Sequence, residues 1–421
     1  LYDDPNWRDA CEVDFVGCSL CPGGIPLMFA RFTSARKPLA RFFVFMSVLW
    51  LAACDVTLAP DANVGQQIDV TKPIQVALLV PGASAQATDN QLAQNFENAA
   101  RLAIADLRGA AIELRVYNTA GGNPQQAAIA ATRAVDDGAK IIIGPLFGEA
   151  ANAAGVAIAG RNVNVLSFSN NRAFAGGNVF ILGATFDNTA ERLVQYASRQ
   201  GINRYMVLHG EDLSGNVGRD AITAAVRNSG GQVVGVESYP LSQQGIFSST
   251  RRIVSDVRSS GAQAVFTTAG ANADLPIIAT ALPDAGMSIA RSPFIGLTRW
   301  DTLPQLVALP GLDGGLFTVP DQNTATLFAN RYAATYGTLP HPLSGLAYDG
   351  IAAIGALAAA GNSDALTKEA LTQPQGFRGT DGVFRLLPNG LNQRGLAVAT
   401  IRDNQVIILE QAPRSFGGPG L

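Results

Sequence analysis

The chain has 421 residues, of which 48% are hydrophobic and 15% are charged, and its net charge is −3. This length allows two or three domains with large buried cores, and the apolar content excludes a disordered chain. The small negative charge excludes a protein that binds nucleic acid through bulk electrostatics. No cysteine follows Cys54 and only two histidines are present, so the body of the chain lacks a disulfide framework and a His-rich metal site.

The first 27 residues carry the three remaining cysteines, Cys11, Cys18 and Cys21. Their spacing matches part of a zinc knuckle, but no fourth ligand follows nearby. We expect residues 1–27 to be a disordered upstream extension of the reading frame, with a genuine disordered leader as the alternative.

Residues 28–53 have the pattern of a secretory signal peptide. Basic residues follow Met28, an apolar run extends over 42–50, and small residues precede Cys54. The run is shorter than the roughly 20 residues that cross a bilayer as a helix. Leu51-Ala52-Ala53-Cys54 resembles the lipobox of bacterial lipoproteins, which implies that Cys54 is acylated and anchors the chain to a membrane.

Residues 54–72 contain proline, glycine and polar residues and are predicted to form a tether between lipid and domain. Asp55 is similar to the inner-membrane retention signal of enteric lipoproteins. The choice between inner and outer membrane stays open.

The next segment, 73–183, alternates short apolar runs with helical patterns. Strands separated by single helices predict right-handed βαβ units and a parallel sheet. Asn123 and Pro124 are typical of a helix start, and Gly138 is typical of a helix end. The predicted strands of this first lobe are 74–80, 112–117, 140–144, 164–169 and 179–182.

A second lobe is predicted over 184–318 by the same alternation. Helices within 319–375 are expected to return to the first lobe, and strands within 376–411 to the second. The sequence therefore predicts an α/β fold of two doubly wound parallel-sheet lobes with a cleft between them. The predicted strands of the second lobe are 204–209, 232–239, 264–268 and 293–297.

Small and polar residues follow most of these strands. Open parallel sheets bind ligands beyond the carboxyl ends of their strands, so these residues are candidates for contact with a ligand or a partner in the cleft. Loop composition alone gives the same pattern. The candidates are Ser84, Gly144, Pro145, Leu146, Phe147, Ser167, Ser169, Asn170, His209, Asp212, Ser214, Thr268, Thr298 and Trp300.

The usual motifs of enzymes and cofactor sites are not found in the sequence. It contains no nucleophile elbow, phosphate-binding loop, dinucleotide fingerprint or zinc-protease motif. Ser214 lies near His209 and Asp212, but a triad needs three groups that converge from different places. We expect a non-enzymatic protein without cofactor or metal.

Several stretches resemble the type I periplasmic-binding fold of the leucine/isoleucine/valine-binding superfamily. They include Ile141-Ile-Ile-Gly-Pro-Leu146 before an alanine-rich helix, Ala347-Tyr-Asp-Gly-Ile351, and Phe377-Arg-Gly-Thr-Asp-Gly-Val-Phe384. Within that superfamily, Gly144-Pro-Leu146, Ser169-Asn-Asn171 and Leu297-Thr-Arg-Trp300 are similar to the penicillin-binding protein activator lipoproteins.

The resemblance implies a lipoprotein that faces the periplasm in a bacterial envelope and regulates peptidoglycan synthesis by binding a penicillin-binding protein. The alternative is a substrate-binding lipoprotein that delivers amino acids or similar small solutes to an ABC permease. Two stretches differ from the pattern of amino-acid receptors of this fold and weaken the case for amino-acid binding. Leu146-Phe147 stands where amino-acid receptors of this fold have a serine, and Ser214-Gly215 replaces a Tyr-Gly turn.

Overall fold

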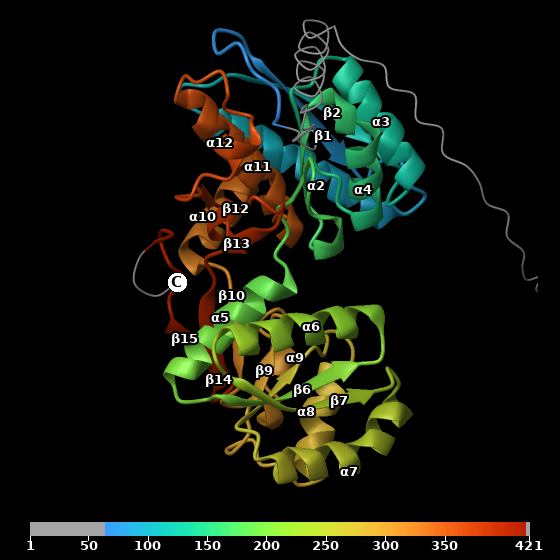
Figure 1. Ribbon diagram of the computed structural model, residues 1–421, viewed down its shortest axis with the longest axis vertical. Helices are drawn as coiled ribbons and strands as arrows, with labels where there is room; N and C mark the ends of the chain where they lie inside the picture. Colours follow the sequence, from blue (N-terminus) through green and yellow to red (C-terminus); the bar gives the residue numbers. More distant parts are fainter. Residues whose placement is uncertain (1–63, 418–421) are drawn as a thin grey trace, which may run out of the picture. The chain divides into compact units, whose positions relative to one another are not determined.

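The structure is a computed structural model that describes residues 64–417. The predicted extension, the signal peptide and Cys54 lie outside the described residues. Within 64–417 the chain forms two α/β lobes built on parallel sheets, which confirms the predicted fold class (Figure 1).

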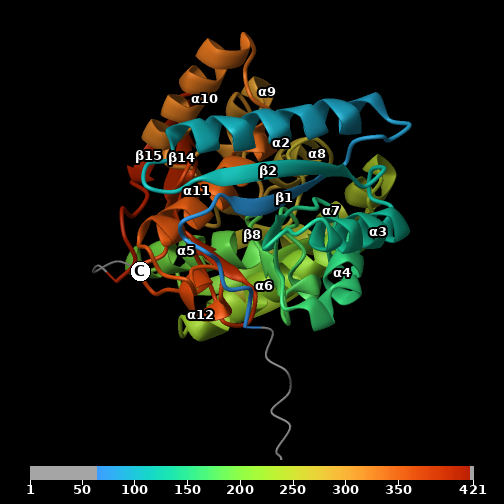
Figure 2. The same ribbon diagram turned by 90° about the horizontal axis from the view of Figure 1, so that it is seen from above.

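The sheet of the first lobe is wholly parallel, with the order β2-β1-β3-β4-β5. It is buried on both faces, which explains why β1 is apolar except at Gln75. Helices α2 and α11 cover one face, and α3 and α4 cover the other (Figure 2). The strands are β1 (Ile74–Val80), β2 (Ile112–Asn118), β3 (Ile141–Ile143), β4 (Asn164–Ser167) and β5 (Val179–Ile181). The helices are α2 (Ala87–Asp106), α3 (Pro124–Asp136), α4 (Gly148–Ala157) and α11 (Gly345–Ala359).

The second lobe repeats this topology. Its parallel strands run in the order β10-β9-β8-β6-β7, and two antiparallel strands, β14 and β15, extend the sheet beyond β10. Helices α5 and α6 pack on one face, and α7 and α8 on the other. The strands are β6 (Arg204–Gly210), β7 (Gln232–Tyr239), β8 (Ala264–Thr267), β9 (Phe294–Gly296), β10 (Leu316–Val319), β14 (Ala397–Arg402) and β15 (Gln405–Glu410). The helices are α5 (Phe186–Arg199), α6 (Leu213–Asn228), α7 (Gln243–Ser260), α8 (Leu275–Asp284) and the short α9 (Pro304–Val307).

Both parallel sheets have the doubly wound order 2-1-3-4-5 when their strands are numbered within each lobe. In such a sheet the chain turns in opposite directions after the two central strands, which leaves a crevice at their carboxyl ends. The crevice lies beyond β1 and β3 in the first lobe and beyond β6 and β8 in the second. Loop residues from 81, 144, 211 and 268 onward therefore border these two crevices.

The chain crosses between the lobes three times, after β5, after β10 and after β13. We expected all strands of 376–411 to join the second lobe. Only β14 and β15 do so; the earlier strands form a separate antiparallel sheet that packs on α11, because Phe377, Phe384 and Leu386 complete the core of the first lobe. The remaining elements are α10 (Gln322–Tyr336), α12 (Lys368–Leu371), β11 (Phe377–Gly379), β12 (Gly382–Leu386) and β13 (Asn392–Arg394).

Residues 64–72, the described part of the expected tether, lie against the first lobe. Ile68 is buried in its core, and its N–H donates to the carbonyl of Ser363 at 2.8 Å. Gly65 exchanges two hydrogen bonds with the side chain of Asn162, at 2.9 and 2.7 Å. Gly65 has a φ of +96°, and a Cβ there would meet the carbonyl oxygen of Leu366 at 2.3 Å, so this contact requires glycine.

The segment Pro342–Ala359, which includes α11, is apolar enough to span a membrane, with a mean hydropathy of 1.3. Here 61% of that segment is buried inside the protein, where α11 packs on α2 and β11. Its apolar composition is therefore explained by its place in the core of the first lobe.

Candidate functional site

A cavity of about 360 Å³ lies where the three crossovers meet. Both lobes contribute to its walls, so its shape depends on how the chain passes between them. The first crossover supplies Gly183 to Thr185, the second Thr318 to Pro320, and the third Arg394 and Leu396. The other lining residues are Leu146, Phe168, Ser169, Asn170, Phe186, Thr189, Leu297, Arg299, Pro342, Leu343, Leu346 and Asp381.

The walls of this interlobe cavity are mainly apolar. Phe168 stacks on Phe96 of α2 with ring centroids 4.3 Å apart, which fixes the floor on the side of the first lobe. Phe186 and Leu297 belong to the apolar core beside α5 and α6 in the second lobe. A cavity of this size and lining is typical of sites for small organic ligands.

A buried ion pair stands beside the cavity. Arg394 donates from Nη1 to Asp349 at 3.3 Å and from Nε and Nη2 to the carbonyl of Leu182 at 3.0 and 2.5 Å. The Asp349 carboxylate also accepts from the N–H of Thr380 at 2.7 Å. Burial raises the pKa of Asp349 to about 6, although Arg394 opposes the shift. Since Arg394 is held on all three nitrogens, it serves as a fixed part of the wall.

Asp381 is the one acidic residue among those that line the interlobe cavity, and its carboxylate makes no hydrogen bond to the described residues. Arg299, which also lines the cavity, forms two hydrogen bonds with Asp301, at 3.0 and 2.5 Å. Burial raises the pKa of Asp381, and Arg394 and Arg299 oppose this effect. With Asp349 the cluster holds two arginines and three aspartates, and Asp381 carries the excess negative charge.

The predicted residues of the first lobe surround the crevice beyond β1 and β3, and three of them reach the interlobe cavity. Leu146, Ser169 and Asn170 line it. Ser84 lies in the loop after β1, where its hydroxyl donates to Asp89 at 2.8 Å. Phe147 is 39% exposed at the start of α4.

Gly144, Pro145 and Ser167 form the frame under this crevice. The Ser167 hydroxyl donates to the carbonyl of Pro145 at 2.8 Å, and Ser167 is fully buried. Gly144 has a φ of +84°, and a Cβ there would meet the carbonyl oxygen of Leu79 at 2.1 Å. These residues hold the loop and offer no free polar group to a ligand.

The predicted residues of the second lobe do not line the interlobe cavity. Asp212 caps α6 by accepting from the N–H of Gly215 at 2.7 Å, and Ser214 is exposed in the first turn of that helix. His209 is buried at the end of β6. Thr268 and Thr298 are half-buried, and the Thr298 hydroxyl donates to the carbonyl of Ala269 at 3.0 Å.

Trp300 is a core residue, and its predicted place at the cleft is wrong. Its side chain is 0% exposed and stacks on Phe317 with ring centroids 5.1 Å apart. Two glycines make room for it, because a Cβ on Gly296 or Gly315 would lie within 2.7 Å of the indole. Trp300 therefore reports on the core of the second lobe and does not touch a ligand in the cavity.

The charged part of the site was not predicted from the sequence. Asp381 lies in the turn between β11 and β12, Arg394 is the last residue of β13, and Arg299 follows β9 next to the predicted Thr298. Their one local signal in the sequence is that each is a charged residue at a turn or at the end of a strand. Within 64–417, no group of three or more His, Cys, Asp or Glu residues is arranged to hold a metal ion.

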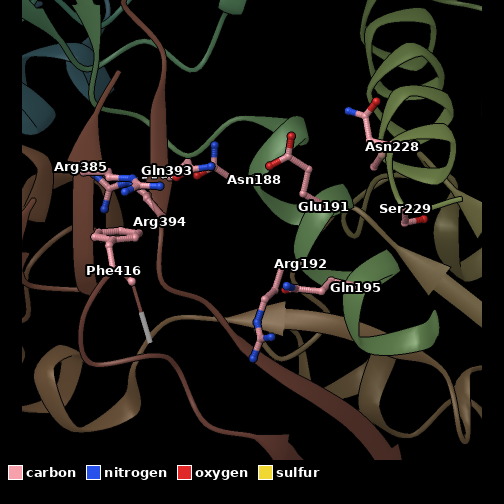
Figure 3. Close-up of a pocket in the computed structure, with 12 residues that line it drawn as sticks. Asn188, Glu191, Arg192, Gln195, Asn228, Ser229, Arg385, Gln393, Arg394 and Phe416 are labelled. Atoms are coloured by element: carbon pink, nitrogen blue, oxygen red, sulfur yellow. Dashed lines mark hydrogen bonds between the residues drawn. The ribbon is translucent and has the colours of Figure 1, made fainter. Parts of the chain in front are cut away.

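A second cavity, of about 660 Å³, lies on the other side of β13, and Arg394 lines both cavities. Figure 3 shows Arg385, Gln393 and Phe416 gathered on one side, and Asn228 and Ser229 on the other. Side chains of α5, including Glu191, lie between these two sides. We call it the α5 cavity.

Two doubly wound lobes, three crossovers and a ligand-sized cavity among them define a protein of the periplasmic-binding class. Residues 73–405 match the family described as periplasmic binding protein, and the chain belongs to this family. No curated protein matches the chain.

Several solved structures with a similar fold are described as ABC transporter proteins. One is described as a branched-chain amino acid ABC transporter from Rhodospirillum rubrum, with 17% identity, a TM-score of 0.68, and coverage of 80% of this chain and 100% of that one. A substrate-binding protein from Desulfitobacterium hafniense in complex with Leu has 17% identity, a TM-score of 0.59, and coverage of 80% and 100%. A solute-binding protein from R. palustris in complex with 4-hydroxybenzoate has 17% identity, a TM-score of 0.56, and coverage of 82% and 97%.

Proposed function

We propose that the protein is a periplasmic solute-binding protein that takes a small molecule into the interlobe cavity and delivers it to an ABC permease. The observation that carries this proposal is the mainly apolar cavity of about 360 Å³ with one unpaired carboxylate, Asp381, in its wall. Family membership and the solute complexes of proteins with the same fold support it.

The walls define the kind of solute. Phe168, Phe186 and Leu297 favour an apolar body, aliphatic or aromatic, because such side chains gain most from excluding water. Ser169 and Asn170, in the loop after β4, add polar groups that orient the ligand. The solute sits among the three crossovers. The lobes can therefore close around it through changes in the backbone angles of the few residues in these segments.

The regulator of a penicillin-binding protein is the second candidate. It rests on the resemblance of Gly144-Pro-Leu146 and Leu297-Thr-Arg-Trp300 to the activator lipoproteins. The exposed Phe147 beside the first of these stretches is a surface on which a partner protein could dock. The solved structures of the same fold favour solute binding over this role.

We also propose that acylated Cys54 anchors the protein to a membrane, with its lobes in the periplasm. The lipobox-like Leu51-Ala52-Ala53-Cys54 supports this proposal. Two or three acyl chains on one cysteine give stable anchoring, which a single chain does not.

A thermal-unfolding screen tests the proposed function. The purified protein is heated with leucine, isoleucine, 4-hydroxybenzoate and a wider panel of amino acids and aromatic acids. A ligand that binds only the folded state raises the unfolding midpoint with its concentration. At least one solute is expected to do so. An unchanged midpoint across the panel, together with capture of a penicillin-binding protein from membranes, would favour the regulator instead.

A further inference from the structure

The α5 cavity is separate from the interlobe cavity and has its own set of polar groups. It is bounded by α5, the end of α6, the β12–β13 hairpin and the chain at 416–417. Its volume of about 660 Å³ is within the range of ligand sites in proteins, roughly 300 to 1,000 Å³. Gly183 to Phe186, which line the interlobe cavity, are absent from its walls.

Arg385 is the cation of this cavity that has no acidic partner. Its Nε donates to Oε1 of Gln393 at 2.8 Å and its Nη1 to the carbonyl of Pro374 at 3.1 Å. The guanidinium lies 4.7 Å from the ring centroid of Phe416. Nη2 has no acceptor within 64–417, so it is available to a ligand carboxylate.

The other two arginines of the α5 cavity are already paired. Arg192 forms an ion pair with Glu410 at 2.8 Å and donates from Nε to the carbonyl of Leu396 at 2.7 Å. Arg394 is paired with Asp349 at 3.3 Å. Among the arginines that line the α5 cavity, Arg385 is therefore the one without an acidic partner in residues 64–417.

Glu191 is the complementary group. Its carboxylate forms neither a hydrogen bond nor an ion pair with the described part of the chain. Partial burial raises the pKa of Glu191, the neighbouring Asp187 adds to the shift, and Arg172 opposes it. A cation placed next to Glu191 would relieve both effects.

Amide side chains also line the α5 cavity. Asn188 is 7% exposed, and its Oδ1 is buried without a partner, while its Nδ2 donates to Thr185 and to the carbonyl of Asn392. A buried acceptor left without a donor costs about 1–3 kcal/mol, so Oδ1 favours a ligand that brings an N–H or O–H. The side-chain amides of Gln195 and Asn228 make no hydrogen bond to other described residues and can donate or accept.

We propose that the α5 cavity binds a short zwitterionic peptide, with its carboxylate on Arg385 and its ammonium on Glu191. The free amides and Asn188 Oδ1 match the alternating N–H and C=O groups of a peptide backbone. The walls thus supply an unpaired partner for each end of the ligand and further polar groups for its backbone.

The experiment is a calorimetric titration of the full chain with three matched peptides: alanyl-alanine, its N-acetyl form and its C-terminal amide. Alanyl-alanine is expected to bind with one site per chain. Each capped form loses one charge-assisted contact and is expected to bind about tenfold more weakly or worse. No binding of alanyl-alanine, or equal binding of all three, overturns the proposal. These titrations need no variant and so do not depend on how a variant folds.

Two variants assign the ends of the peptide. Glu191→Gln is expected to weaken the binding of alanyl-alanine about tenfold and to leave the binding of the N-acetyl form unchanged. Arg385→Gln is expected to weaken the binding of alanyl-alanine about tenfold and to leave the binding of the C-terminal amide unchanged. Arg402→Gln and Glu369→Gln, which remove exposed charges elsewhere, are the matched controls. A third variant, Asn170→Trp, alters the interlobe cavity. If it abolishes peptide binding while Glu191→Gln and Arg385→Gln leave that binding intact, the peptide binds in the interlobe cavity and the proposal is overturned.

Discussion

The guanidinium of Arg394 lies 3.3 Å from the carboxylate of Asp349, and the two side chains are 5% and 1% exposed. Asp349 belongs to α11, and Arg394 ends β13 just before the third crossover. The pair ties the core helix of the first lobe to the point where the chain passes to the second. It therefore fixes one wall of the interlobe cavity.

Breaking this pair is expected to destabilise the protein strongly. Arg394→Met leaves the Asp349 carboxylate buried without its cation and releases the carbonyl of Leu182, which we expect to cost about 3–5 kcal/mol of unfolding free energy. Denaturant unfolding measures the loss. Arg101→Met, which breaks the exposed pair with Glu97, is the control, with an expected change of about 0.5 kcal/mol or less. A similar small change for Arg394→Met would show that the buried pair contributes little.

Asp349 is expected to make stability fall between about pH 4 and pH 6. Burial raises its pKa from the usual 3.8 to about 6, so the folded state holds this proton more tightly than the unfolded chain. The contribution of Asp349 to the unfolding free energy is about 3 kcal/mol. It is fully present below pH 4 and is lost as the pH rises through 6. Unfolding free energies measured across this range for the native protein and for Asp349→Asn test the assignment. The difference between the two should decline as predicted; a constant difference would contradict it.

Gly144 is expected to tolerate no side chain. In Gly144→Ala the new Cβ would meet the carbonyl oxygen of Leu79 at 2.1 Å, and the backbone would keep a φ of +84°. We expect a loss of about 2 kcal/mol or more, read from thermal or denaturant unfolding. Gly160→Ala is the matched control, because nothing lies within 4 Å of its Cβ position. Equal effects of the two substitutions would refute the steric argument.

Cys54 is expected to decide where the protein is found in a bacterial cell. Cys54→Ala removes the thiol that carries the acyl chains, so the protein should move from the membrane fraction to the soluble fraction. Fractionation followed by immunoblotting measures this change. Retention of the Cys54→Ala protein in membranes would show that another segment anchors it.

The fold was accessible from sequence because its strands are local and strongly patterned. Ile141–Ile143 is apolar throughout and Ile74–Val80 is apolar except at Gln75, as expected of strands buried on both faces. Asn123 and Pro124 mark the start of α3 through short-range chemistry. The separate third sheet was not anticipated, since β11 and β13 have three residues each and depend on packing against α11.

The candidate site was predicted only in part. Leu146, Ser169 and Asn170 follow strands, so their place at the crevice comes from topology alone. Arg394 and Asp349 are 45 residues apart in the chain, and nothing local in the sequence indicates that they meet. Trp300 follows a strand as the other candidates do, but Gly296 and Gly315 leave space for its ring inside the core. A residue's position after a strand therefore predicts that it lies in a loop at the crevice, but it does not predict whether its side chain points into the cavity or into the core.

The central claim is that the interlobe cavity binds a small solute. The most direct measurement is calorimetric titration of the native protein and of Asn170→Trp with the solute that raises the unfolding midpoint most. Asn170 is exposed and lines the cavity, so tryptophan there narrows it without disturbing the core. Asn330→Trp, on the exposed side of α10, is the control. We predict one site per chain in the native and control proteins and at least a tenfold loss of affinity in Asn170→Trp; unchanged affinity in Asn170→Trp would contradict the account.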